Sequence, residues 1–143
     1  MTEQAGFLLV RASGRWVGLP VEQLLAVADF GQPHPVPSPE PAMRGIASVR
    51  GETMPVIHLG ALLAGGACPA AQGETGVVVS VDGVRICLEV DEADVVVRET
   101  ALPLPSASSM PWARAVVRRP EGLVPLLDLT ALGARLAGMG SDS

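Results

Sequence analysis

The sequence contains no lysine, asparagine or tyrosine, and aromatic residues make up only 3% of its 143 positions. Hydrophobic residues nevertheless make up 48% of the chain, so its core must consist mainly of aliphatic side chains. All ten basic residues are arginine, and the net charge is −5. An acidic protein is a poor ligand for nucleic acid and for anionic lipid, because both attract basic surfaces. We therefore expect a single domain that binds no nucleic acid.

Cysteine and histidine are also scarce, with two of each. Cys68 and Cys87 form no Cys-x-x-Cys pair, so we expect free thiols in a reducing compartment. The N-terminal stretch has an apolar run of only four residues, which is too short for an export signal. The isolated cysteines and histidines also lack the ligand spacing of a zinc site. The sequence therefore predicts a cytoplasmic protein with no metal and no cofactor.

One uncharged segment, residues 53–73, is long enough to cross a membrane as a helix. It contains two prolines and four glycines, together with His58 and Gln72. Because these residues make a poor bilayer helix, we expect no direct insertion into a membrane.

The order of sequence signals occurs twice along the chain. The matching segments are 7–27 with 76–96, at a shift of 69 residues, and 54–63 with 124–133, at a shift of 70 residues. Such self-similarity indicates an internal duplication. The predicted organisation within residues 1–143 is a first copy over about 6–64, a linker over about 65–76 and a second copy over about 77–137.

Each copy is rich in short aliphatic runs separated by turn residues, a pattern typical of β-hairpins. The expected hairpin turns lie at residues 13–14, 50–52 and 82–83. Proline-rich residues 31–41 cannot join a central strand ladder, so we expect an extended surface connection there. The only convincing helix is terminal, over residues 128–138, with Asp128 as its N-cap.

These elements predict an all-β protein of two small barrels with a short C-terminal helix. A barrel of about 65 residues is marginally stable on its own. We therefore expect the two copies to bury a shared apolar core, at about 1.5–3 kcal/mol for each fully buried aliphatic side chain.

Catalytic residues are hard to find in this sequence. Nucleophilic catalysis needs a nucleophile, a base and an orienting group. We expect His34 to lie in a solvated loop, His58 to be a half-buried structural residue, and Cys87 to pack in the core. The acidic run 91–94 is expected to be a solvated turn, not a cation site. The chain is therefore interpreted as a binding module and not an enzyme; the alternatives are a small hydrolase that uses Cys68 or His58, and a regulatory barrel that binds a small molecule.

Residues 45–59, GIASVRGETMPVIHL, resemble the signature of the CheW-like family of chemotaxis coupling proteins. The matching residues are Gly45, Ile46, Val49, Arg50, Gly51, Pro55, Val56, Ile57 and Leu59. The opening strands, the proline-rich connection and the closing LVPLLDLTALG also fit, so the resemblance covers about residues 6–137. It implies a fold of two five-stranded SH3-like barrels packed on a common hydrophobic core.

The resemblance also implies a function, that of a non-enzymatic scaffold adaptor in chemotaxis signal transduction. Its implied partners are the regulatory domain of a CheA-type histidine kinase and the cytoplasmic tip of a methyl-accepting chemoreceptor, in membrane-associated arrays. The expected partner-binding residues are Ser48, Val49, Arg50, Gly51 and Glu52. Among them Arg50 is the best candidate, because arginine is favoured at the centres of protein interfaces.

Three positions depart from the family pattern. Ser48 stands in place of the family's Asn, His58 in place of its Asp, and Gly60 in place of a frequent Arg. We expect His58 to cap the following turn poorly, and the cation missing at position 60 to have been close to Arg50. These departures allow a second interpretation, in which the chain is a divergent member. It would serve a non-flagellar pathway (motility or other) and bind only one of the usual partners.

Overall fold

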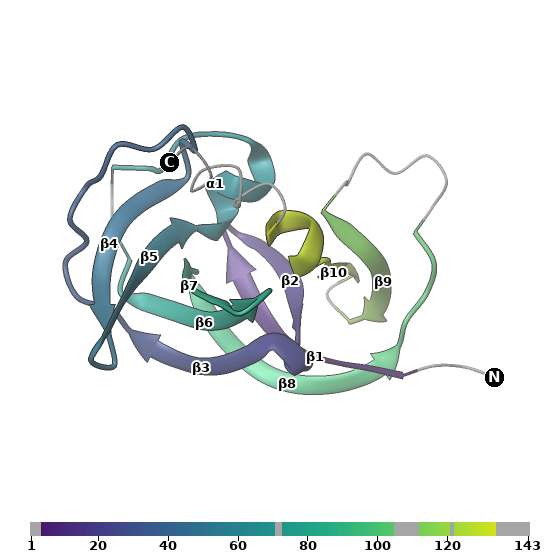
Figure 1. The fold of residues 1–143 in the computed structure, drawn as a ribbon. Coiled ribbons are helices and arrows are strands. Elements are labelled where there is room, and N and C mark those ends of the chain that lie inside the picture. The colour runs from purple at the N-terminus through teal and green to yellow at the C-terminus, as the bar shows by residue number, and fades with distance from the viewer. Residues whose placement is uncertain (1–3, 71–72, 105–111, 121, 134–143) are drawn as a thin grey trace.

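The computed structural model describes residues 4–70, 73–104, 112–120 and 122–133 (Figure 1). Over these ranges most of the chain forms strands, which make up two sheets of five strands each. The first sheet has the order β8 (Glu92–Thr100), β1 (Gln4–Ala12), β2 (Arg15–Pro20), β10 (Gly122–Leu127), β9 (Ala113–Arg119). The second sheet has the order β3 (Leu24–Asp29), β6 (Thr75–Val81), β7 (Val84–Glu89), β5 (Glu52–His58), β4 (Met43–Val49). The all-β prediction is confirmed.

Each sheet combines strands from both sequence copies. Strands β1 and β2 of the first copy join β8, β9 and β10, whereas β6 and β7 of the second copy join β3, β4 and β5. The chain changes sheet after β2, through the short 3-10 helix η1 (Val21–Gln23). The predicted ranges 6–64 and 77–137 therefore do not delimit the two barrels. Because β1 pairs with β8 and β5 pairs with β7, neither copy completes a barrel alone.

The main hydrophobic core is shared by the two sheets. It includes Leu8 and Leu19 from the first sheet and Ile57 and Leu88 from the second, all at most 3% exposed. Each sheet also has a smaller cluster of buried side chains of its own. Cys87 belongs to the cluster of the second sheet; it is fully buried, and this burial raises the pKa of its thiol to about 12. Both the shared core and the packing role of Cys87 are as predicted.

Three hairpins turn through two consecutive residues of positive φ. The pairs are Ser13–Gly14, Arg50–Gly51 and Asp82–Gly83, with φ of 51–52° at the first residue and 80–82° at the second. Positive φ at both central residues defines the type I′ turn, whose twist matches that of the paired strands. The predicted hairpin turns are therefore confirmed.

The proline-rich residues 31–41 pass along the edge strand β4 of the second sheet. They form no strand; an isolated bridge joins His34 to Ile46, with N–H···O distances of 2.8 and 3.0 Å. His34 itself is exposed. The segment is thus the extended surface connection that its prolines predicted.

A short helix follows the last strand of each copy. Helix α1 (Leu59–Ala64) follows β5, and residues 129–133 are helical after β10. The sequence predicted only the second helix, whose expected residues 134–138 lie outside the described ranges. Helix α1 is uniformly apolar, so its sequence could not be distinguished from a continuation of the buried strand. Among the described helices, none has the length and apolar character that a membrane span requires.

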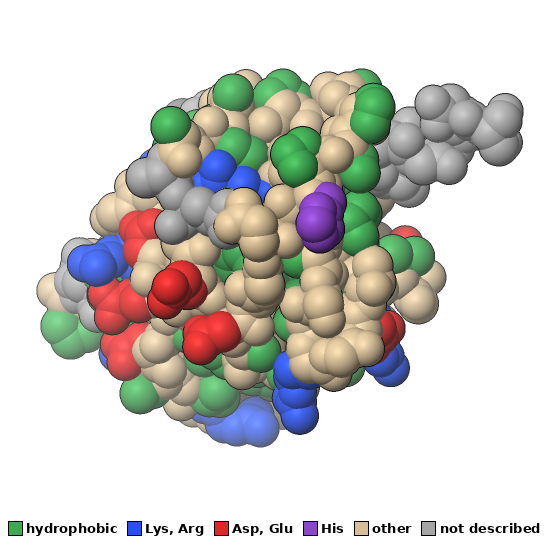
Figure 2. Space-filling view, turned by 90° about the vertical axis from the view of Figure 1, so that its left-hand side faces the viewer, with side chains coloured by type: hydrophobic (Ala, Val, Ile, Leu, Met, Phe, Trp, Pro, Cys, Tyr) green, Lys and Arg blue, Asp and Glu red, His purple; other side chains and the backbone are tan. Residues whose placement is uncertain are grey.

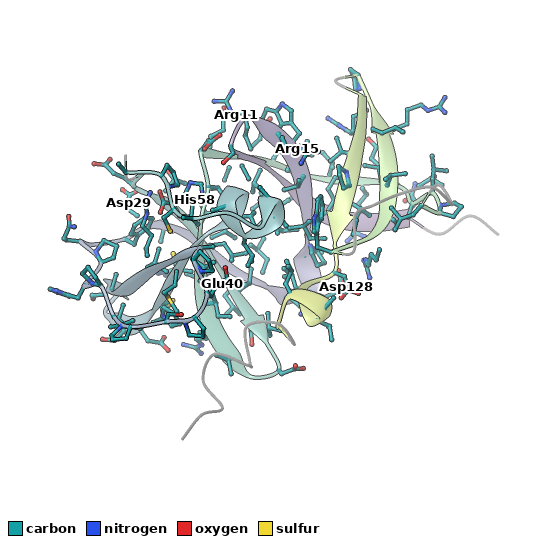
Figure 3. All side chains as sticks on the ribbon, turned by 90° about the horizontal axis from the view of Figure 1, so that it is seen from above. Arg11, Arg15, Asp29, Glu40, His58 and Asp128 are labelled. Atoms are coloured by element: carbon teal, nitrogen blue, oxygen red, sulfur yellow. The ribbon has the colours of Figure 1, made fainter. Side chains whose placement is uncertain are left out.

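The N-caps of these helices are His58 and Asp128, both labelled in Figure 3. Asp128 Oδ1 accepts a hydrogen bond from Ala131 N at 3.0 Å, which confirms the predicted cap. His58 Nδ1 accepts one from Ala61 N, also at 3.0 Å. The expectation that His58 caps poorly is therefore wrong, because a neutral imidazole offers one ring nitrogen as an acceptor. Burial lowers the pKa of His58 and so favours this neutral form.

Candidate functional site

The five expected partner-binding residues lie at the tip of the β4–β5 hairpin. Ser48, Arg50, Gly51 and Glu52 are exposed there. Val49 is different, because only 1% of its surface is exposed and it packs among the core residues of the second sheet. This difference follows from strand geometry, in which neighbouring side chains point to opposite faces. Val49 can therefore position the tip, but its side chain is not available to a partner.

Arg50 is held in a defined backbone conformation at the tip. Its φ of 52° lies in the left-handed region, which costs a non-glycine residue about 1–2 kcal/mol. Its guanidinium forms no hydrogen bond or ion pair with any described residue. The adjacent Glu52, by contrast, is paired with Arg85 of β7, at 2.5 Å between Oε1 and Nη1. The tip thus presents one cation that pairs with no residue in the described part of the chain.

A hollow of about 270 Å³ lies beside Arg50. Its lining consists of Leu25, Ala26, Val49, Arg50, Glu52, Met54, Val78 and Arg85. Several of these side chains are apolar, and Leu25 is 49% exposed. The second-sheet side of the molecule shows hydrophobic side chains interspersed with charged ones (Figure 2). Apolar surface beside an exposed arginine is the composition that protein interfaces favour.

Exposed valines on β3 and β8 form a second feature, which sequence reasoning missed. Val27 on β3 is 48% exposed, and Val95 and Val96 on β8 are 51% and 57% exposed. The shift of 69 residues places Val27 on Val96, and both strands run along the lower side of the molecule in Figure 1. The duplication was the signal that could have identified them. Strand β3 has aliphatic residues at both odd and even positions, so the alternation of apolar and polar residues could not show which side chains face outward.

A buried ion pair connects the two copies and fixes the linker. Arg44 of β4 donates to Glu89 of β7 from two nitrogens, with Nε–Oε1 of 2.8 Å and Nη2–Oε2 of 3.2 Å. Their side chains are only 10% and 4% exposed. Glu89 Oε2 also accepts from Gly73 N at 2.8 Å, and Arg44 Nη1 donates to Pro69 O at 2.5 Å. The linker segment therefore lies against the second sheet at fixed points.

Cys68 and His58, the residues of the hydrolase alternative, both donate a hydrogen bond to one backbone carbonyl group. Ala42 O accepts a hydrogen bond from Cys68 Sγ at 3.0 Å and another from His58 N at 2.8 Å. Burial raises the pKa of the Cys68 thiol, which therefore stays protonated and is a weak nucleophile. The Nδ1 atom of His58 is already engaged as the helix cap. Among the described residues no group of three potential ligands could hold a metal.

The glycine at position 60 is explained by packing and not by the hairpin tip. Strand β5, of seven residues, separates Gly60 from Arg50 and spans about 20 Å. The expectation that a cation here would lie close to Arg50 is therefore wrong. A Cβ atom on Gly60 would lie 1.9 Å from Ser13 Oγ, so α1 packs directly on the β1–β2 turn. No larger residue fits this contact without movement of the backbone.

Comparisons with known proteins agree with this architecture. A family model described as the CheW-like domain matches residues 6–136. No curated protein matches the sequence. The fold is similar to the crystal structure of the scaffolding protein TtCheW from Thermoanaerobacter tengcongensis, with a TM-score of 0.74 at 15% sequence identity. That alignment covers 88% of this chain and 90% of the other, and it supports the fold of two SH3-like barrels.

Proposed function

Because this chain belongs to the CheW-like domain family, we propose that it is a non-enzymatic scaffold adaptor of chemotaxis signal transduction. It would couple a methyl-accepting chemoreceptor to the regulatory domain of a CheA-type histidine kinase in the cytoplasm. The observation that carries the proposal is the family match, which spans both barrels apart from the first two residues of β1. The likeness to a solved scaffolding protein supports the same assignment at the level of the fold.

The molecular surface is large enough for two partners at once. A standard interface takes about 800 Å² from each protein. Two such interfaces would occupy about a fifth of the accessible surface of 7623 Å². The β4–β5 tip and the exposed valines on β3 and β8 are the two candidate contact areas. We assign receptor-linked coupling to Arg50, whose exposed guanidinium could pair with a carboxylate of the partner.

The chemistry of the isolated thiol and imidazole supports a binding role. The Cys68 thiol donates to a backbone carbonyl, and the His58 ring accepts a backbone N–H. Both interactions stabilise the local fold and leave neither group as an activated nucleophile or base. A hydrolytic activity that depends on Cys68 would require a depressed thiol pKa, whereas burial raises it.

Calorimetric titration with the cognate kinase regulatory domain and with a receptor-tip fragment tests the proposal. Saturable binding to both, together with a ternary complex in size-exclusion chromatography, is the expected result. Binding to neither partner would overturn the adaptor assignment. Binding to only one would support the divergent interpretation. His58 still caps its helix, and Gly60 serves packing against Ser13, so these two departures follow from local structure.

A further inference from the structure

A hollow of about 580 Å³ opens beside the first sheet, between residues of β1, β8, β9 and η1. It shares no lining residue with the hollow at the β4–β5 tip. It is lined by Gln4, Ala5, Gly6, Val21, Glu22, Arg98, Ala101, Arg114 and Ala115. Its volume lies within the range of roughly 300–1,000 Å³ that is typical of small-molecule sites, which often occupy the mouths of β-barrels.

The floor of this hollow is built from small aliphatic residues. Ala5, Ala101 and Ala115 pack against the core cluster of the first sheet, which also contains Phe7 and Leu126. Each alanine is only partly buried, so its outer side faces the hollow. Methyl groups backed by a packed core offer a rigid, apolar surface for a short aliphatic group.

Gly6 brings the guanidinium of Arg98 close to this floor. The two residues are paired across β1 and β8. A Cβ atom on Gly6 would lie 3.5 Å from Arg98 Nη1 and 3.1 Å from Val21 Cγ2. The Arg98 side chain therefore extends over Gly6, in space that a larger residue at position 6 would share.

Arg98 and Arg114 are the two cations of the hollow. Neither forms a hydrogen bond or an ion pair with any described residue. Four other arginines in the described ranges are paired with carboxylates: Arg11, Arg44, Arg85 and Arg119. In a chain of net charge −5, two arginines and one glutamate line this hollow, which leaves a local surplus of one positive charge.

We propose that this hollow binds a small aliphatic carboxylate. The guanidinium groups of Arg98 and Arg114 hold the carboxylate by charge-assisted hydrogen bonds, and the alkyl group lies on the alanine floor. Glu22 also lines the hollow, and its negative charge disfavours a dianion such as phosphate relative to a monoanion. The site would let a small metabolite act on the adaptor separately from its protein partners.

Titration of the purified full-length chain with butyrate, followed by amide chemical shifts, tests this site. Saturable shifts centred on Gly6, Ala101 and Ala115 are expected. The variants Arg98→Gln and Arg114→Gln should each weaken butyrate binding by about tenfold, the equivalent of one charge-assisted hydrogen bond. Arg118→Gln is the matched control, because Arg118 is an exposed arginine on the same strand as Arg114 but does not line the hollow. Thermal unfolding of all three variants checks that the fold is unchanged.

Inorganic phosphate and a hexaglutamate peptide, each at matched ionic strength, identify the class of ligand. Weaker binding of both than of butyrate supports the proposal. Equal or tighter binding of phosphate, binding of the peptide alone, or equal weakening by Arg118→Gln would overturn it. Because the kinase and the receptor are absent from this experiment, its failure would leave the adaptor assignment standing.

Discussion

His58 and Asp128 occupy equivalent places in the two copies, and each accepts the N–H of the residue three positions later at 3.0 Å. The two copies thus share the same helix-cap position, but the acceptor is an imidazole nitrogen in the first copy and a carboxylate oxygen in the second. A carboxylate accepts a hydrogen bond over the whole neutral pH range, whereas an imidazole Nδ1 accepts only while that nitrogen is unprotonated. The first copy therefore carries a pH-dependent cap that the second copy lacks.

Lowering the pH below the ordinary histidine pKa of about 6.5 should destabilise the protein through His58. Burial places the folded-state pKa of His58 below its unfolded value. Between these values the unfolded chain binds more protons, so the stabilisation is complete above about pH 6.5 and is lost as the pH falls toward the folded-state pKa. Thermal unfolding midpoints at about pH 7.5 and pH 5.5 measure the effect.

Two asparagine variants isolate this contribution. His58→Asn keeps an acceptor at the cap but does not titrate, so its midpoint should change less between the two pH values. His34→Asn alters an exposed histidine and should behave as the unmodified chain does. The same pH dependence in His58→Asn and in the unmodified protein would show that this cap is not the titrating element.

Removing one partner of the Arg44–Glu89 pair should cost more than removing both. Arg44→Met leaves the Glu89 carboxylate buried without its cation, which typically costs about 3–5 kcal/mol. Arg44→Met combined with Glu89→Leu removes both charges and should be less destabilised than the single variant. The free energy of unfolding in urea measures both. If the double variant proves less stable than Arg44→Met, the contacts of the two side chains with Pro69 and Gly73 of the linker contribute more than the burial of an unpaired charge costs.

The fold class was readable from the sequence because its strongest signals are local. Each type I′ turn needs positive φ at two consecutive residues, and Ser13-Gly14 and Asp82-Gly83 supply glycine at the second position. The exchange of strands between copies was not readable, because it depends on which strands pair over long range. A strand such as β2 carries no mark that tells whether β10 or β5 will be its neighbour.

The candidate site was predictable only in part for a similar reason. Arg50, placed at a turn by the residues around it, is exposed as expected. Val49 belongs to the same motif but is buried, because strand alternation decides its direction. The cap role of His58 depends on α1, whose apolar sequence resembles a buried strand. The pair Arg44–Glu89 joins residues that are 45 positions apart, which no local pattern reveals.

Replacing the exposed valines should weaken partner binding and leave stability unchanged. Val27→Ser and Val96→Ser each remove apolar surface that is already about half exposed, so the stability should change by less than about 0.5 kcal/mol. Calorimetric titration with the kinase domain and the receptor tip measures the loss. Val84→Ser is the control, because Val84 is 55% exposed but follows the β6–β7 turn, away from β3 and β8 in sequence. Equal losses in all three variants would argue against a specific contact at β3 and β8.

Reversing the charge of Arg50 should weaken association with the receptor tip by about tenfold or more, because arginines at interface centres often contribute over 1.4 kcal/mol. The unfolding midpoint of Arg50→Glu should stay unchanged, since no described residue pairs with the guanidinium. Arg118→Glu serves as the charge-matched control on the first sheet. Unfolding of Arg50→Glu would identify Arg50 as a structural brace.

A second substitution at the same position separates conformation from charge. Asn tolerates the left-handed conformation better than Arg does, so Arg50→Asn should raise stability by up to about 1 kcal/mol while receptor association still falls. Unchanged association in Arg50→Asn would mean that the positive charge itself is not recognised.

The contact between α1 and the β1–β2 turn predicts a rescue experiment. Gly60→Ala places a Cβ atom 1.9 Å from Ser13 Oγ, and this overpacking should cost about 1–3 kcal/mol. Ser13→Gly removes the obstructing side chain at a residue whose φ of 51° suits glycine, so alone it should be neutral or stabilising. In the Ser13→Gly background the two closest obstructing atoms are gone and the backbone nitrogen of residue 13 lies at 3.1 Å, so Gly60→Ala should be tolerated much better. Urea denaturation of the four proteins gives the coupling energy between the two positions. Purely additive losses would show that α1 does not pack on this turn as described.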